Sequence, residues 1–160
     1  MRLMILAVGR MKAGPERELV ERYVARAAVG ARSVGLAGFE LREIDEGRGR
    51  SAQTRKTAEA QAISAVLPRG ALALALDETG EAATSAAFAA RIARARDAAT
   101  AAFALVIGGP DGLDAVWRQS CAASLAFGAM TWPHQLVRIM AAEQLYRATT
   151  ILSGHPYHRA

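Results

Sequence analysis

Residues 102–112, Ala-Phe-Ala-Leu-Val-Ile-Gly-Gly-Pro-Asp-Gly, decide the fold class of this chain. Six apolar residues run directly into a glycine-rich turn, which is typical of a buried strand that ends at a loop. Three other short segments are apolar or alternating in the same way: Leu3–Val8, Phe39–Ile44 and Ala71–Leu76. The sequence therefore predicts four buried strands, Ala102–Ile107 among them.

Helical patterns lie between these strands. Helix-forming residues with apolar positions three or four apart occupy Glu16–Ala28, Thr54–Val66 and Ser85–Ala98. The alternation of strand and helix predicts an α/β fold, in which a mainly parallel sheet carries helices on both faces.

Beyond the glycine-rich turn, the pattern changes to helix. We expect a short helix near Asp114–Ser120 and an apolar segment near Ala123–Met130. A long helix should then run from about His134 to Leu152, with Pro133 in its first turn and Gly154 at its C-terminal cap.

Composition indicates one ordinary globular domain over residues 1–160, because 52% of the residues are hydrophobic and 22% are charged. The single Cys121 excludes an internal disulfide and offers no cysteine-based metal site, which is consistent with a reducing cytosol. The first nine residues contain too short an apolar run for a signal peptide, and no stretch approaches a transmembrane span. We therefore expect a cytoplasmic protein without a membrane segment.

The positive charge lies in the first part of the chain. Residues 1–69 hold 13 Lys and Arg against 8 Asp and Glu, whereas residues 70–160 hold 7 of each, so the net charge of +5 belongs to the N-terminal part. A basic lobe attached to a neutral one fits a polyanion such as nucleic acid. The alternative is an arginine-biased surface that only faces solvent.

Three loops in the second half follow strand ends, at Leu76–Gly80, Ile107–Gly112 and Phe127–Pro133. In an open parallel sheet, ligands bind beyond the carboxyl ends of the strands, so these loops are expected to share one pocket. Glycine lets a ligand approach the backbone closely, and the almost uncharged third loop suits an adenine ring. The alternative for Gly-Gly-Pro-Asp-Gly is a tight turn without a ligand.

The C-terminal region concentrates side chains that suit acid–base chemistry and RNA stacking. Glu143 and Arg147 form an i,i+4 pair on the long helix, and the tail His155–Arg159 follows it. Arg138 should face the opposite side from Arg147, because nine residues separate them. The alternative for the tail is a frayed end. Two tail histidines without further ligands do not make a zinc site, so we expect no metal.

Four motifs in fixed order resemble a known family. These are Ile107–Leu113, Met130–Arg138, Glu143–Ala148 and His155–Arg159. Together they are similar to the ribosomal RNA large-subunit methyltransferase H family, within the knotted SPOUT methyltransferases. The similar length and the opening Ala-Val-Gly at residues 7–9 extend this resemblance over essentially the whole chain.

The resemblance implies a C-terminal deep trefoil knot, a homodimer, and S-adenosylmethionine bound at the knot. Gly128 stands where many relatives have serine, and Trp132 where leucine or phenylalanine is common, so the fit of the cofactor is expected to differ. The implied cofactor-binding residues are Leu76, Gly108, Gly109, Gly128, Ala129, Met130, Thr131, Trp132 and Pro133.

The implied reaction is methylation of N3 of a pseudouridine in large-subunit ribosomal RNA, within the large subunit or the assembled ribosome. His158 is the candidate base, Arg147 would stabilise negative charge on the nucleobase, and Tyr157 would stack on it or donate a hydrogen bond to it. Two alternatives stay open, a knotted methyltransferase for transfer RNA and a non-catalytic ribosome-associated RNA-binding factor.

Overall fold

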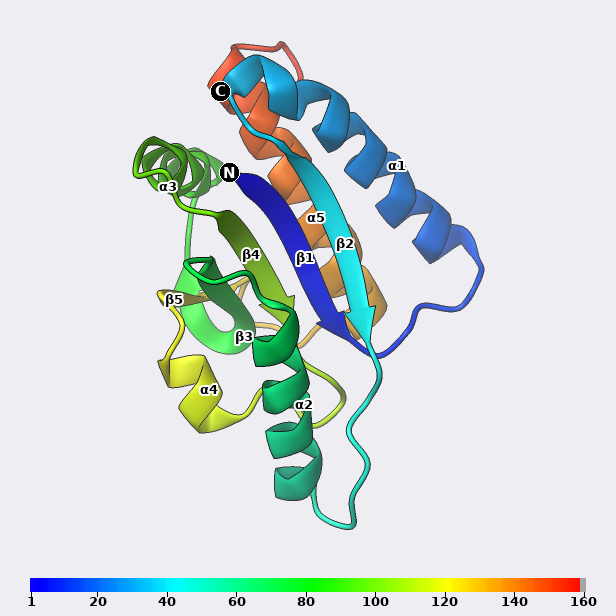
Figure 1. Ribbon diagram of the computed structural model, residues 1–160. Helices are drawn as coiled ribbons and strands as arrows, with labels where there is room; N and C mark the ends of the chain where they lie inside the picture. The colour runs from blue at the N-terminus through cyan, green and yellow to red at the C-terminus, as the bar shows by residue number, and fades with distance from the viewer. Residues whose placement is uncertain (159–160) are drawn as a thin grey trace.

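A five-stranded parallel sheet organises the computed structural model, which describes residues 1–158 (Figure 1). Its strands lie in the order β2-β1-β4-β3-β5, and every neighbouring pair is parallel. The predicted α/β class is confirmed. The strand bounds are β1 Arg2–Val8, β2 Gly38–Ile44, β3 Leu72–Ala82, β4 Ala102–Ile107 and β5 Ala123–Ala126.

Helices cover both faces of this sheet, as predicted. Successive residues of β1 point to opposite faces, so Leu3 and Ile5 belong to one hydrophobic core while Met4 and Leu6 belong to the other. The first core lies under α1 (Pro15–Ala31), α3 (Ser85–Asp97) and α5 (His134–Ser153), and α1 is followed by the short 3-10 helix η1 (Arg32–Val34). The second core lies under α2 (Ala52–Val66) and α4 (Ala115–Gln119).

Side-chain and glycine caps set the helix ends. Ser51 caps α2 by accepting a hydrogen bond from the backbone amide of Thr54, and Asp114 caps α4 in the same way. Gly154 ends α5 in the left-handed conformation, at φ +67°, which confirms the predicted cap. Pro133 is the residue before the first helical one, not a member of the first turn as expected.

The third strand is longer than the sequence predicted. It continues through residues 77–80, which were expected to be a loop, and ends at Ala82. The reason is tertiary, because β5 pairs with β3 at two places: Leu125 is opposite both Leu76 and Glu81. The backbone of β3 therefore bends around β5 at Leu125.

None of the helices in residues 1–158 is both long enough and apolar enough to cross a membrane.

Candidate functional site

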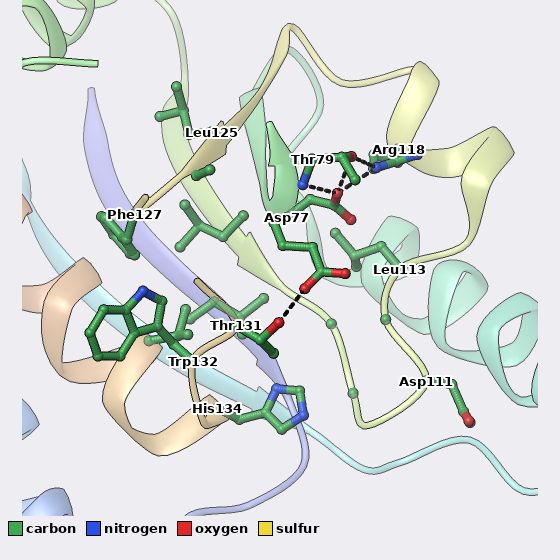
Figure 2. Close-up of a pocket in the computed structure, with 18 of the residues that line it drawn as sticks. Asp77, Thr79, Asp111, Leu113, Arg118, Leu125, Phe127, Thr131, Trp132 and His134 are labelled. Atoms are coloured by element: carbon green, nitrogen blue, oxygen red, sulfur yellow. Dashed lines mark hydrogen bonds and ion pairs between the residues drawn. The ribbon is translucent and has the colours of Figure 1, made fainter. Parts of the chain in front are cut away.

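A cavity of about 510 Å³ opens at the carboxyl ends of β3, β4 and β5 (Figure 2). The loops that follow β4 and β5 meet there with residues 76–79 of β3 and the first residues of α4 and α5. Seven of the nine implied cofactor residues line this cavity: Leu76, Gly108, Gly109, Gly128, Met130, Thr131 and Trp132. Ala129 is exposed and is not among the lining residues described, and Pro133 lines a neighbouring cavity.

The cavity lining is part polar and part apolar, and its apolar residues form one wall. Leu113 and Leu125 are buried and point toward the space, and Phe127 and Trp132 stand at its side (Figure 2). Trp132 is 40% exposed and Met130 is 72% exposed, so the rim presents large apolar side chains to the outside. Such a pocket suits a ligand with a flat ring and few charges.

One polar cluster lies at the end of β3. Arg118 of α4 donates a hydrogen bond to Asp77, and the amide of Thr79 donates to the same carboxylate at 3.0 Å (Figure 2). Burial alone would raise the pKa of Asp77, but the hydrogen bonds from Thr79 and the charge of Arg118 outweigh it and lower that pKa. Asp77 is therefore ionised and held in place. Its pairing with Arg118, 41 residues away, had no signal in the sequence.

A second carboxylate reaches the third loop. The hydroxyl of Thr131 donates to Glu78 at 2.8 Å, which joins the loop after β5 to β3 (Figure 2). Within residues 1–158, Glu78 has no ion-pair partner. It is thus a negative charge in the cavity lining that is available to a cationic ligand.

The glycines of the turn after β4 are required by the protein's own packing. A Cβ atom at Gly108 would lie 2.8 Å from the carbonyl carbon of Gly112. At Gly109 it would lie 3.0 Å from Val8 Cγ1 and 3.1 Å from Glu59 Oε1. The close contacts at these two glycines come from neighbouring protein atoms, whereas the sequence led us to expect the close approach of a ligand.

The same turn is fastened to α2. Arg55 donates two hydrogen bonds to Asp111, from Nε at 2.6 Å and from Nη2 at 3.0 Å. The hydrogen bond from Arg55 lowers the pKa of Asp111, so this pair is ionised at neutral pH. The two residues lie 56 positions apart, so no local pattern in the sequence predicted their pairing.

A smaller cavity of about 310 Å³ adjoins the first, and both are lined by Pro110 and His134. Pro133 and Arg138 line this smaller space. Arg138 is 4% exposed and donates to the carbonyl oxygens at the end of β1, at 2.6 and 2.9 Å. Burial lowers its pKa from the ordinary value.

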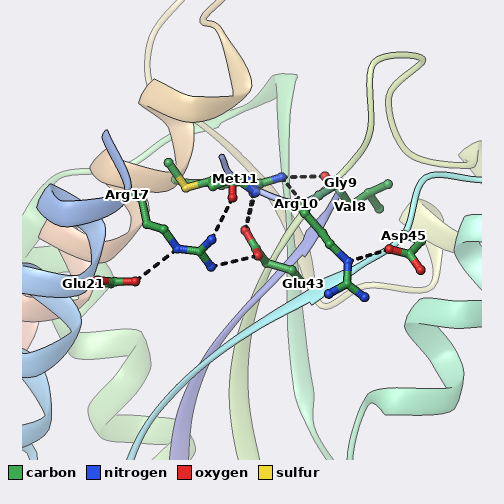
Figure 3. Close-up of polar contacts among 9 residues, drawn as sticks. Val8, Gly9, Arg10, Met11, Arg17, Glu21, Glu43 and Asp45 are labelled. Carbon is green, nitrogen blue, oxygen red and sulfur yellow. Dashed lines mark hydrogen bonds and ion pairs between the residues drawn. The ribbon is translucent and has the colours of Figure 1, made fainter. Parts of the chain in front are cut away.

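Glu43 is the centre of the polar network beside that cavity (Figure 3). Its carboxylate accepts hydrogen bonds from the Met11 amide and from Arg17 and Arg138, at 2.8, 3.3 and 2.8 Å. Four elements are tied together in this way: the end of β1, β2, α1 and α5. Nearby, Arg10 pairs with Asp45 at 2.7 Å (Figure 3).

The implied catalytic residues cluster at the other end of α5. Arg147 Nε donates to Glu143 at 2.9 Å, the Tyr157 hydroxyl donates to the same oxygen at 3.1 Å, and the guanidinium lies 4.9 Å from the Tyr157 ring centroid. Burial and the Glu143 charge raise the pKa of Tyr157 to about 12. His158 Nδ1 is buried and, among the residues described, has no hydrogen-bond partner. Arg159 lies outside the described residues.

This cluster and the cavity are separated along one chain. From His134 at the cavity to Arg147, α5 rises about 20 Å, at roughly 1.5 Å per residue. In Figure 1 the tail lies at the end of the sheet opposite the strand arrowheads. Arg138 and Arg147 have different environments, the first inside the fold and the second beside the tail.

Comparisons with known proteins cover the whole described chain. A family described as "Predicted SPOUT methyltransferase" matches residues 1–158. Ribosomal RNA large subunit methyltransferase H of Rhodopseudomonas palustris (strain HaA2) is 52% identical over all of both chains. The protein of the same name from Methylocella silvestris is 54% identical over 99% of both chains. A solved structure, a probable methyltransferase from Bordetella pertussis Tohama I, is 18% identical with a TM-score of 0.50, covering 92% of this chain and 95% of its own.

Proposed function

Because the chain belongs to the SPOUT methyltransferases, in the family of ribosomal RNA large subunit methyltransferase H, we propose that it methylates N3 of a pseudouridine in large-subunit ribosomal RNA. The methyl donor is S-adenosylmethionine. One structural observation carries this proposal: the loops after β4 and β5, which hold two of the family-like motifs, converge with residues 76–79 of β3 on one cavity at the carboxyl edge of the sheet.

The cavity fits this cofactor in size and in chemistry. Its volume of about 510 Å³ falls within the range of small-molecule sites, about 300–1,000 Å³. Leu76, Leu113 and Leu125 offer apolar walls for the adenine ring, and Glu78 offers a negative charge to the cationic part. When bound, S-adenosylmethionine supplies an electrophilic methyl group on sulfur and leaves as S-adenosylhomocysteine.

We include the trefoil knot in this proposal. It is supported by the double pairing of Leu125 with Leu76 and Glu81, and by Gly80, where a Cβ would lie 2.5 Å from the Leu125 carbonyl carbon. A segment that is threaded through a bend of β3 must pass this close to the β3 backbone. Threading is rare among proteins, so it would be a family-specific feature.

A homodimer explains how the tail reaches the cofactor. Within one chain the tail lies about 20 Å along α5 from the cavity, so the tail of one subunit would serve the cavity of its partner. The apolar rim supports a partner there, because Met130, Trp132 and Leu136 are 72%, 40% and 40% exposed. The active site is then completed by the second subunit.

The tail side chains have distinct roles in this mechanism. His158 would take the proton from N3 and so make the ring nitrogen nucleophilic toward the methyl group that bound S-adenosylmethionine would supply. Arg147 stabilises the negative charge that develops on the nucleobase carbonyl oxygens. Tyr157 acts as a hydrogen-bond donor, because a phenol is protonated at neutral pH and the raised pKa extends this to more alkaline pH.

Mapping of methylated nucleotides by mass spectrometry tests the substrate. Ribosomes and transfer RNA lacking the modification would each be incubated with the protein and labelled cofactor. We expect one methyl group at N3 of a pseudouridine in the large-subunit RNA. Methylated transfer RNA would favour a transfer RNA enzyme. Cofactor binding without methyl transfer to either RNA would favour a non-catalytic binding factor.

A variant at the cavity mouth tests the cofactor site. Ala115, exposed at the start of α4, lines the cavity, so Ala115→Trp should fill part of it and weaken S-adenosylmethionine binding at least about tenfold in calorimetry. Val116→Trp is the matched control, because Val116 is 77% exposed on the same helix and is not a lining residue. Equal S-adenosylmethionine affinities in the two variants would show that the cofactor binds elsewhere.

A further inference from the structure

A short basic loop joins β2 to α2 beside the cofactor cavity. Residues 46–51, Glu-Gly-Arg-Gly-Arg-Ser, are called the arginine loop below. Arg48 and Arg50 are exposed, and Lys56, one turn into α2, lines the cavity itself. In Figure 1 this loop lies at the same end of the molecule as the strand arrowheads.

The positive charges of this loop are not neutralised within the fold. The nearby cations Arg10 and Arg55 are paired with Asp45 and Asp111, at 2.7 and 2.6 Å. By contrast, the part of the chain that the structure describes holds no ion-pair partner for Arg48, Arg50 or Lys56. Arg48 and Arg50 are therefore exposed cations without an ion-pair partner, and Lys56 adds a half-buried cation in the cavity lining.

Contacts with α2 hold the loop in place. The Gly47 amide donates to Glu59 at 2.8 Å, and the Gly49 carbonyl accepts from Arg55 Nη1 at 3.1 Å. A Cβ at Gly47 would lie 2.3 Å from the Arg55 carbonyl oxygen, so the backbone of the loop lies against the helix. The backbone of the loop is thus fixed against α2, and its two arginines are exposed to solvent.

One buried carboxylate joins this loop to the turn after β4, residues 108–112, which is called the cofactor turn below. Glu59 is 4% exposed, and its Oε2 has no hydrogen-bond partner among residues 1–158. Both of its oxygens lie 3.1–3.2 Å from the position of a Cβ at Gly109. The Arg55–Asp111 pair makes a second link between α2 and the same turn. The arginines are therefore held at a fixed position relative to the methyl donor.

We propose that the arginine loop and Lys56 bind the phosphates of the RNA strand that flanks the target nucleotide. This inference rests on the proposed function, which makes a polyanion the substrate. Arginine presents a planar fork that matches two phosphate oxygens, and unpaired cations release the counterions of RNA when they bind. Because the loop is fixed to the cofactor turn, docking of the phosphates places the nucleobase at the cavity.

The salt dependence of RNA binding tests this surface. The double variant Arg48→Gln/Arg50→Gln would be compared with wild type on a labelled hairpin RNA containing pseudouridine, over about 50–200 mM potassium chloride. Two lost phosphate contacts should reduce the slope of log K against log salt by roughly 1.4 to 1.8, and lower the affinity at 0.1 M salt by about tenfold or more. Calorimetry should give the same S-adenosylmethionine affinity in both proteins.

Arg69→Gln/Arg94→Gln is the matched control. Both residues are exposed, neither has an ion-pair partner within the described residues, and both lie toward the amino ends of the strands, away from the cavity. This variant loses the same charge and should keep the wild-type slope. Equal slopes in the two double variants would overturn the assignment to the loop, even when methyl transfer itself is normal. Absence of methyl transfer by wild type would instead reject the proposed function.

Discussion

Backbone contacts within the protein require glycine at position 80. A Cβ atom there would lie 2.5 Å from the carbonyl carbon of Leu125 and 2.7 Å from its nitrogen. The neighbour is strand backbone, which cannot rotate away as a flexible side chain does. Gly80 is therefore the residue that lets β3 bend closely around β5.

Replacement of Gly80 by alanine should destabilise the fold. The added methyl group overpacks a backbone crossing, so we expect a loss of about 1–3 kcal/mol or more in the free energy of unfolding. Urea denaturation followed by circular dichroism measures it. Ala83→Ser, an exposed position just past the strand, adds one atom and should change little. The same urea midpoint in both variants would contradict the close crossing.

The Tyr157 phenol makes stability depend on pH in the alkaline range. Burial first, and then the Glu143 carboxylate, raise its pKa to about 12. The folded value exceeds the unfolded one of about 10, so the contribution is complete below pH 10 and is lost as the pH rises toward 12. Tyr157→Phe should reduce the alkaline loss of stability, as seen by denaturation at a series of pH values. An unchanged alkaline profile would count against this environment.

At the scale of elements, the tail and α5 form one unit. The Tyr157 ring lies 4.7 Å from that of Tyr146, which lies 6.1 Å from Tyr23 of α1. These aromatic contacts, with the Arg147 guanidinium over Tyr157, hold residues 155–158 against the helices. The described part of the tail therefore packs on the fold, in contrast to the alternative of a frayed end.

Deletion of residues 155–160 should separate binding from chemistry. The cavity loops remain, so S-adenosylmethionine affinity should stay within about twofold, while methyl transfer should fall by about 10²–10⁴-fold. Single-turnover methylation and calorimetry give the two numbers. The variant His158→Ala, which keeps the aromatic contacts of Tyr157, serves as the control for lost packing. Full activity of the truncated protein would show that the tail has only a structural role.

At the scale of the whole molecule, the cavity and the tail lie at opposite ends of one subunit. The exposed apolar side chains of Met130 and Trp132 border the cavity, and Leu136, in the first turn of α5, is also exposed. A symmetric dimer that covers these side chains would bring the tail of one subunit to the cavity of the other. The proposed chemistry therefore depends on assembly as well as on the fold of one chain.

Mixed dimers test that dependence. A subunit lacking residues 155–160 would be combined with an Ala115→Trp subunit, and each homodimer should be nearly inactive. Random pairing should restore roughly a quarter of wild-type activity, because half of the dimers are mixed and each has one intact site. The control is a double variant that carries both changes in one subunit. Its homodimer has no intact site and should stay inactive. No recovery on mixing would show that each subunit uses its own tail.

Local sequence was sufficient for most elements of the fold. Apolar runs such as Ala102–Ile107 predicted the buried strands, and capping residues such as Gly154 predicted the helix ends, because both signals depend on residues close together in the chain. The gathering of the loops after Leu76, Ile107 and Ala126 also followed from sequence, since carboxyl ends of parallel strands share one edge.

Tertiary structure alone decided the strand order, the second pairing of Leu125 and the ion pairs Arg55–Asp111 and Arg118–Asp77. It also decided that Arg147 and Tyr157 lie far from the cavity within one chain. The physical reason is the same in each case. Periodicity and capping report on neighbours within a turn or two, whereas these contacts join residues tens of positions apart, whose meeting depends on how the whole chain packs.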